Sequence, residues 1–104
     1  MNPPNRGEVW LVDLGLAAKI RPALVLNVLP GEKERSLTTM VPHTTSLRGS
    51  QYEVPIEVTF LRPGAFDTQG LVTVPTARLV RRLGSLSPEQ MKAVENGVRA
   101  WLGL

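Results

Sequence analysis

One segment of the chain alternates strictly between apolar and polar residues. In Tyr52–Phe60, every even position is apolar or aromatic, and every odd position is glutamate, proline or threonine. Successive side chains of a β-strand point to opposite faces, so this period of two is typical of a strand with one face on a core. Proline cannot donate to a sheet ladder, so Pro55 predicts a free edge or a bulge. A chain with such a segment must build a sheet.

Other segments rich in β-forming residues predict further short strands, five or six in all. These further strands are Glu8–Leu14, Pro22–Leu29, Ser36–Pro42, Leu71–Val74 and Leu79–Leu86. The segments between them are expected to be a loose leader over residues 1–5, a short connection over Gly15–Lys19, a charged hairpin loop from Pro30 to Arg35, and a turn region over Leu61–Asp67.

The hydrophobic period changes near the C-terminus. Ser87 is a suitable N-cap, Pro88 suits the first helical position, and Gln90 completes a capping box. The apolar residues that follow fall near one helical stripe, and they are Met91, Val94, Val98, Trp101 and Leu102. We therefore predict a helix over residues 87–102 that ends at Gly103, with Trp101 buried on the stripe.

These elements fit a single domain over residues 1–104, mainly β with a C-terminal helix, and a small β-barrel is the expected architecture. The length leaves no room for two domains, and 42% hydrophobic residues can bury one modest core. Gly97 lies inside the predicted helix, where glycine costs about 1 kcal/mol relative to alanine. It therefore predicts a close contact that only a small residue allows.

The residue inventory excludes several kinds of catalytic site. There is no cysteine, so thiolate nucleophiles and thiolate metal sites are absent. A single histidine cannot form a two-histidine acid–base pair within one chain. The acidic residues are dispersed, and the closest regular pair, Glu53 and Glu57, would lie about 13 Å apart on the outer face of a strand. What remains is an activity that needs no cofactor and no metal, or no activity.

The charge favours an anionic partner. The net charge is +3, and nine of the twelve cationic residues are arginine, whose rigid fork matches phosphate oxygens. No run approaches the roughly 18 apolar residues of a membrane span, and the N-terminus has no signal-peptide pattern. We therefore expect a cytoplasmic protein that does not associate with a membrane.

The segment Lys19-Ile20-Arg21-Pro22 is suited to binding an anion. It comes directly before a hydrophobic strand, and proline fixes the backbone at that point. The Arg21 guanidinium could then grip a phosphate and stabilise a pentacoordinate transition state. The alternative is an ordinary surface arginine at the start of a strand.

A second segment, Val41–Ser50, carries hydroxyls, an imidazole and a guanidinium within a few residues. These groups belong to His43, Thr44, Thr45, Ser46 and Arg48. Together they could bind a bent phosphodiester, although a polar turn whose hydroxyls satisfy local backbone groups is the alternative. His43 shares strand parity with Val41, so it would face the core if that parity persists.

In this order, the two segments resemble those of the MazF/PemK (also Kid) family of type II toxins. Arg6–Leu14 resembles the family's first strand, and Arg21–Leu26 resembles its Arg-Pro-x-Val/Leu-Val-Ile/Leu signature. Val41–Ser46 resembles the end of its third strand, and Glu53-Val54 its fourth strand. The similarity covers nearly the whole chain.

The resemblance implies an SH3-like barrel and metal-independent, sequence-selective cleavage of single-stranded RNA. It implies that Arg21 stabilises transition-state charge and that Thr44 positions the scissile phosphate or the attacking 2′-hydroxyl. The candidate RNA contacts are Lys19, His43, Thr45, Ser46 and Arg48. The substrate's own 2′-hydroxyl would attack, leaving a 2′,3′-cyclic phosphate and a 5′-hydroxyl, so the reaction needs no cofactor.

The resemblance also implies partners. A co-encoded antitoxin would place an acidic C-terminal segment in the RNA groove, and operator DNA would bind only to the toxin–antitoxin complex. A barrel this small offers a shallow surface, so we expect a homodimer whose two copies form the groove. The basic residues that could flank it are Arg48, Arg78, Arg81 and Arg82.

The chain departs from the family in two places, and two other functions stay open. The Gly15–Lys19 connection is short, and the arginine and aspartate that act as acid and base in Kid-like members fall on Thr73 and Pro75. One alternative is a non-catalytic barrel. The other is a CcdB-like toxin that poisons DNA gyrase through a C-terminal Trp-Gly-Ile, to which Trp101-Leu102-Gly103 is similar; a buried Trp101 would argue against it.

Overall fold

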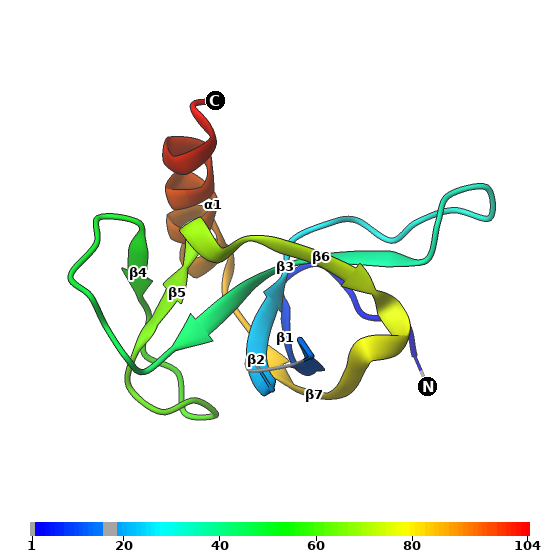
Figure 1. Cartoon of the computed structure of the whole chain (residues 1–104), viewed down its shortest axis with the longest axis horizontal. Coiled ribbons are helices and arrows are strands. Elements are labelled where there is room, and N and C mark those ends of the chain that lie inside the picture. The colour runs from blue at the N-terminus through cyan, green and yellow to red at the C-terminus, as the bar shows by residue number, and fades with distance from the viewer. Residues whose placement is uncertain (1, 16–18) are drawn as a thin grey trace.

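A computed structural model describes residues 2–15 and 19–104 (Figure 1). Over these residues the chain forms seven strands, two short 3-10 helices and one α-helix, which confirms the predicted mainly β fold with a C-terminal helix. The strands are β1 (Glu8–Asp13), β2 (Ile20–Val25), β3 (Leu37–Thr44), β4 (Glu53–Pro55), β5 (Ala65–Asp67), β6 (Val72–Pro75) and β7 (Leu79–Ser85). The helices are η2 (Thr68–Gly70), η3 (Thr76–Arg78) and α1 (Pro88–Leu102).

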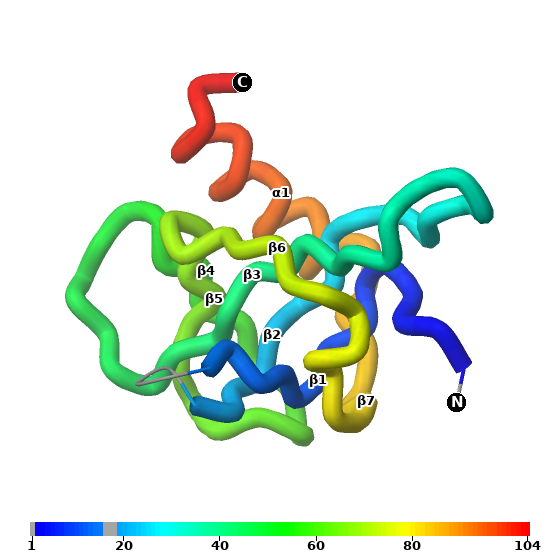
Figure 2. The backbone as a smooth tube through the Cα atoms, turned by 45° about the vertical axis from the view of Figure 1, so that its right-hand side comes forward, coloured from blue at the N-terminus to red at the C-terminus, as the bar shows by residue number. Residues whose placement is uncertain are grey.

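Strand β3 is the centre of the sheet. The strand order is β4-β5-β3-β2-β1-β7, and β6 also pairs with β3. The first half of β3, Leu37–Met40, pairs with β6, whereas its last two residues pair with β5. The strands β6 and β7 lie at opposite ends of the path β6-β3-β2-β1-β7, yet only η3 separates them in the chain. The five strands therefore curl into a small barrel (Figure 2).

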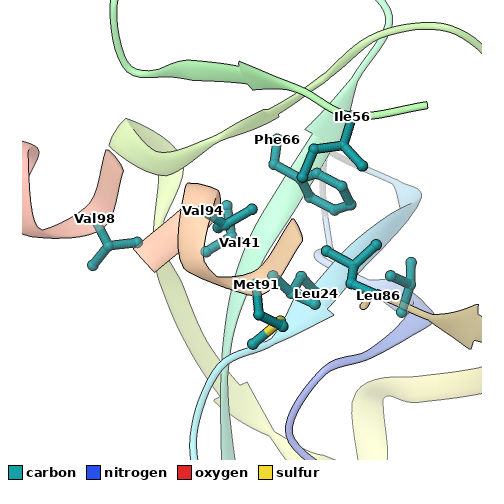
Figure 3. Packing of buried hydrophobic residues seen from close by; sticks show 9 residues of the cluster. Leu24, Val41, Ile56, Phe66, Leu86, Met91, Val94 and Val98 are labelled. Atoms are coloured by element: carbon teal, nitrogen blue, oxygen red, sulfur yellow. The ribbon is translucent and has the colours of Figure 1, made fainter. Parts of the chain in front are cut away.

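The curled sheet has a hydrophobic cluster on each face. One cluster lies inside the barrel and consists of Trp10, Val12, Ala23, Val25, Met40, Val74 and Leu79. The other, the helix-side cluster, lies between the sheet and α1, where Met91, Val94 and Val98 pack toward Leu24 and Val41 (Figure 3). Because successive side chains of a strand point to opposite faces, residues that are adjacent in sequence pack into different clusters.

Helix α1 begins and ends as its sequence predicts. The Ser87 hydroxyl accepts a hydrogen bond from Gln90 N and the Gln90 side chain accepts one from Ser87 N, which forms the capping box. Gly103 ends the helix with φ of 74°. A Cβ on Gly97 would lie 2.9 Å from Thr68 Cγ2 and 3.0 Å from Val54 Cγ2, which confirms the predicted close contact.

The prediction that Trp101 is buried was wrong. Trp101 is 41% exposed, and Leu102 is 49% exposed. The last turn of α1 extends beyond the sheet, so the helical stripe continues past the core that covers its first turns (Figure 1). The Trp101 ring instead packs edge-on against Tyr52, with ring centroids 5.2 Å apart.

The strand predicted over Tyr52–Phe60 was also wrong in extent, because only Glu53–Pro55 pairs, with β5. Pro55 has no N–H, and the ladder stops there. The alternation in the residues that follow reflects burial: Ile56 is buried and Phe60 is half-buried against the helix-side cluster, whereas Glu57 is exposed. Apolar packing without a paired strand therefore produced the same pattern.

Strands β5, β2 and β3 also differ clearly from the predictions. Strand β5 lies within the predicted turn over residues 61–67, because its partners β3 and β4 are distant in sequence. Strand β2 starts at Ile20 and ends at Val25, earlier than predicted at both ends. Strand β3 continues through His43 and Thr44, which carries part of the polar segment into the sheet. Of the Gly15–Lys19 connection, residues 16–18 lie outside the described residues.

Candidate active-site cleft

A cleft of about 640 Å³ opens where β2 begins and β3 ends. Antiparallel pairing of Ala23 with Pro42 brings these two strand ends together. Strand β7 pairs with β1 and contributes Arg81 and Leu83 to the cleft. The described residues that line the cleft are Leu11, Ile20, Arg21, Pro22, His43, Thr45, Phe60, Leu61, Arg62, Arg81 and Leu83.

Three arginines give the cleft its charge. Arg21 comes from β2, Arg81 from β7, and Arg62 from the segment between β4 and β5. The described lining residues include no carboxylate. Three guanidinium groups on a partly apolar floor favour a ligand with several negatively charged oxygens, such as a nucleic-acid backbone.

The position of Arg21 follows from the register of the sheet. Arg21 pairs with Val12 and Pro22 pairs with Leu11, so both lie within the β1–β2 ladder. The sheet thereby fixes the backbone of Arg21, and Arg21 itself is exposed and lines the cleft. A guanidinium on such a backbone can hold two phosphate oxygens in a defined geometry.

His43 lines the cleft and is also buried. It is 4% exposed, and its ring packs edge-on against Phe66 with centroids 5.1 Å apart. Its Nε2 has no hydrogen-bond partner within the described structure. Burial lowers the pKa of His43, so the imidazole is neutral at neutral pH. The strand parity that placed His43 with Val41 persists, and His43 forms the boundary between core and cleft.

The polar residues after His43 divide between the cleft and the turn. Thr45 lines the cleft. The Thr44 hydroxyl accepts a hydrogen bond from Ser46 N at 3.0 Å, and it stabilises the turn at the end of β3. Thr44, Ser46 and Arg48 are not among the residues lining the cleft. Lys19 is exposed with φ of 57°, and it too lies outside the lining.

Glu53 has a structural role in this region. Its carboxylate accepts backbone hydrogen bonds from Arg48 at 3.0 Å, Gly49 at 2.9 Å and Ser50 at 3.1 Å. These bonds, that from Arg48 first, lower the pKa of Glu53. The carboxylate therefore closes the loop before β4. In the described part of the chain, no three His, Asp or Glu residues gather closely enough to hold a metal ion.

Among the cleft residues that sequence reasoning missed are Phe60 and Arg62. Phe60 was assigned to the apolar face of a long strand, and Arg62 to a turn. Arg81, which we predict to flank a groove formed by two copies, lines this cleft of a single chain. The one available signal was an aromatic residue and an arginine two positions apart beside Pro63-Gly64, a combination typical of a surface turn and therefore weak.

The described helix α1 is too short and too polar to cross a membrane.

Comparison with known proteins gives consistent matches. The family model described as "PemK-like, MazF-like toxin of type II toxin-antitoxin system" matches residues 5–102. A probable endoribonuclease MazF5 of Mycobacterium tuberculosis is 32% identical over 94 residues, which cover 88% of this chain and 85% of that protein.

Solved structures share the fold. The Mycobacterium tuberculosis toxin MazF-mt6 superposes with a TM-score of 0.80 at 27% identity, over 93% of this chain and 97% of that one. An endoribonuclease in complex with its cognate antitoxin, from a mycobacterial species, gives a TM-score of 0.82 at 24% identity over 97% and 96% of the two chains. A MazF from Deinococcus radiodurans gives 0.83 at 22% identity over both full chains. The last two matches bear on the fold alone.

Proposed function

Because this chain belongs to the PemK-like, MazF-like family of type II toxins, we propose that it is an endoribonuclease toxin that cleaves single-stranded RNA at selected sequences. The observation that most supports this function is the cleft, with three arginines and no carboxylate among its described lining residues. Such a surface attracts a phosphodiester and stabilises the extra charge that forms at phosphorus during cleavage.

In the proposed reaction, the RNA supplies its own nucleophile. The 2′-oxygen forms a bond to phosphorus, and the bond from phosphorus to the 5′-oxygen breaks. The proton of the 2′-hydroxyl is lost and the leaving 5′-oxygen gains one, so the products are a 2′,3′-cyclic phosphate and a 5′-hydroxyl. Arg21 stabilises the non-bridging oxygens of the pentacoordinate transition state.

Thr44 is proposed to orient the scissile phosphate. Its hydroxyl accepts a hydrogen bond from Ser46 N at 3.0 Å, and its contact with Ser46 O is long at 3.5 Å, so the hydroxyl proton can be donated to a ligand. Its neighbours His43 and Thr45 both line the cleft. The further RNA contacts are proposed for Lys19, His43, Thr45, Ser46 and Arg48. Single-turnover cleavage by Thr44→Val at an unchanged rate would remove Thr44 from the mechanism.

The proposed protein partner is an antitoxin with an acidic C-terminal segment. Carboxylates of such a segment would bind the arginines of the cleft and exclude RNA from it, and operator DNA would bind only to the complex. An acidic peptide that failed to compete with RNA would contradict this arrangement. The alternative of a gyrase poison is not favoured, because the family match covers residues 5–102 and names a different group of toxins.

Cleavage is predicted to continue in EDTA. The chain has no cysteine and a single histidine, and attack by a 2′-hydroxyl needs no metal-bound water. The purified protein should cut RNA equally with EDTA and with magnesium, and the fragments should carry cyclic phosphate ends, detectable by mass spectrometry. Activity that disappears with chelator and returns with magnesium would contradict the mechanism.

A homodimer is predicted to form through the exposed end of α1. Trp101, Leu102 and Leu104 are 41%, 49% and 85% exposed there, and an apolar group of this kind is typical of an interface. Sedimentation at micromolar concentration should give a dimer, and Trp101→Asp should give a monomer, whereas Lys92→Asp on the same helix should stay dimeric. A monomeric wild-type protein would refute the prediction.

A further inference from the structure

We propose that Phe60 is a stacking platform for one base of the RNA, next to the phosphate held by the arginines. The inference rests on the proposed function, and it adds a residue that binds a base rather than a phosphate. It is carried by the contact between the Phe60 ring and Gly84, together with the place of Phe60 in the cleft.

Phe60 reaches the cleft because the chain leaves the sheet after Pro55. The segment that follows returns to the sheet only at β5. It presents Phe60, Leu61 and Arg62 in succession to the cleft. An aromatic ring and a guanidinium therefore lie on the same short segment, so one nucleotide could place its base on the ring and its phosphate at the guanidinium.

Gly84 gives the ring a flat seat on β7. A Cβ at Gly84 would lie 2.5, 2.6 and 2.7 Å from three atoms of the Phe60 ring, so a side chain there would displace the ring. The three nearly equal distances place the face of the ring over the glycine. Gly84 pairs with Val9 beside a register shift in the β1–β7 ladder, a place where glycine often accommodates a bulge or the close approach of another group. The absence of a side chain at Gly84 leaves the space that the Phe60 ring occupies.

The supported ring is only half-buried, although it also packs against the helix-side cluster. The ring has one face toward β7, and Phe60 lines the cleft together with Leu61 and Leu83. Arg21, Arg62 and Arg81 line the same cleft. Aromatic platforms among cations bind single-stranded nucleic acids because every base has a π-face that can stack.

The test separates stacking from a purely structural role of Phe60. The probe is a short RNA that contains a site cleaved by the wild-type protein, with a 2′-deoxy nucleotide at the scissile position to prevent cleavage. A set of such probes carries one abasic nucleotide at each position in turn. Their affinities are measured by fluorescence anisotropy for the wild type, Phe60→Leu, Phe60→Trp and Gly84→Ala, with Thr59→Ala as the control at an exposed neighbour outside the cleft lining.

For the wild type, removal of one particular base should weaken binding about 5- to 150-fold, the range expected for loss of one stacked base. Phe60→Leu keeps an apolar side chain over the core but has no ring. It should weaken binding of the intact probe by a similar factor and be insensitive to removal of that base. Phe60→Trp should keep the wild-type pattern, and Gly84→Ala, which displaces the ring, should behave like Phe60→Leu.

Two outcomes would overturn this inference but leave the proposed function standing. One is a protein that cleaves RNA normally while Phe60→Leu binds the intact probe like the wild type. The other is a Phe60→Leu variant that still loses affinity when the same base is removed, because the two losses would then be independent. A wild-type protein that neither binds nor cleaves RNA would instead refute the proposed function.

Discussion

Replacing Arg21 by lysine should slow RNA cleavage about 10²–10³-fold, or about 3–4 kcal/mol of transition-state stabilisation, nearly as much as replacement by alanine. The reason is geometric. Arg21 is fixed within the β1–β2 ladder through its pairing with Val12, and its side chain lines the cleft. A planar guanidinium can hold two oxygens of the transition state at once, whereas a lysine ammonium is a single point charge.

Lysine substitutions at the other two arginines of the cleft, Arg62 and Arg81, can be compared with the one at Arg21. If Arg62 and Arg81 act by attracting the RNA backbone, lysine at either position should keep most of the activity, because the charge is retained. Arg35→Lys, in the exposed connection between β2 and β3, is the matched control outside the cleft. Single-turnover cleavage gives the chemical step, and a 2′-deoxy analogue gives the affinity separately.

The result that would move the catalytic assignment away from Arg21 is simple. A lysine variant that cleaves within about threefold of the wild type would make Arg21 a docking charge, since the transition state would not then need its second donor. RNA affinity should change far less than the rate, because Arg62 and Arg81 supply the remaining attraction.

How much of the fold could be predicted depended on whether a signal was local. The capping box of α1 and the end at Gly103 were predicted correctly, because the residues that form them are close in sequence. Strand β5 was missed, because Ala65–Asp67 forms a strand only through pairing with β3 and β4. Pairing between distant segments leaves little trace in a three-residue strand.

The alternation over Tyr52–Phe60 shows a different limit. It predicted correctly that Ile56 is buried and that Glu57 is exposed, but it cannot distinguish a paired strand from an extended segment packed on a core. Pro55 was the informative residue, because the ladder ends where the N–H is missing. The same error hid the cleft position of Phe60, which was counted as one more core residue of a strand.

The two motifs located part of the cleft, and the topology of the sheet supplied the rest. Of the site residues predicted in those motifs, Arg21, His43 and Thr45 line the cleft, whereas Lys19, Thr44, Ser46 and Arg48 do not. Arg62 has no motif around it and reaches the cleft only because the segment before β5 folds back toward the end of β3. Side-chain direction also mattered: the Thr44 hydroxyl bonds to Ser46 N in the turn, which the sequence of the motif does not reveal.

The glycine at position 64 should be the position least tolerant of a single added methyl group. A Cβ there would lie 2.2 Å from the Thr44 carbonyl oxygen and 2.8 Å from His43 Cε1. The nearer atom belongs to the backbone of β3, so no rotamer change can relieve the clash. Because Ala65 pairs with Thr44, the methyl group would force β5 away from the end of β3.

Gly64→Ala should therefore lower the free energy of unfolding by about 3 kcal/mol, at the upper end of the usual cost of overpacking. For a domain of this size that loss corresponds to a fall in Tm of about 10–25 °C, measurable by circular dichroism. Gly49→Asn is the control, since nothing lies within 4 Å of its Cβ position and asparagine tolerates its φ of 77°. RNA cleavage should also be slower at temperatures below the Tm, where the variant is still folded, because the displaced atoms belong to His43 and Thr44. A Gly64→Ala protein that melts within about 2 °C of the wild type, which corresponds to less than about 0.5 kcal/mol, would show that β3 and β5 separate at little cost and that their contact does not hold the cleft in shape.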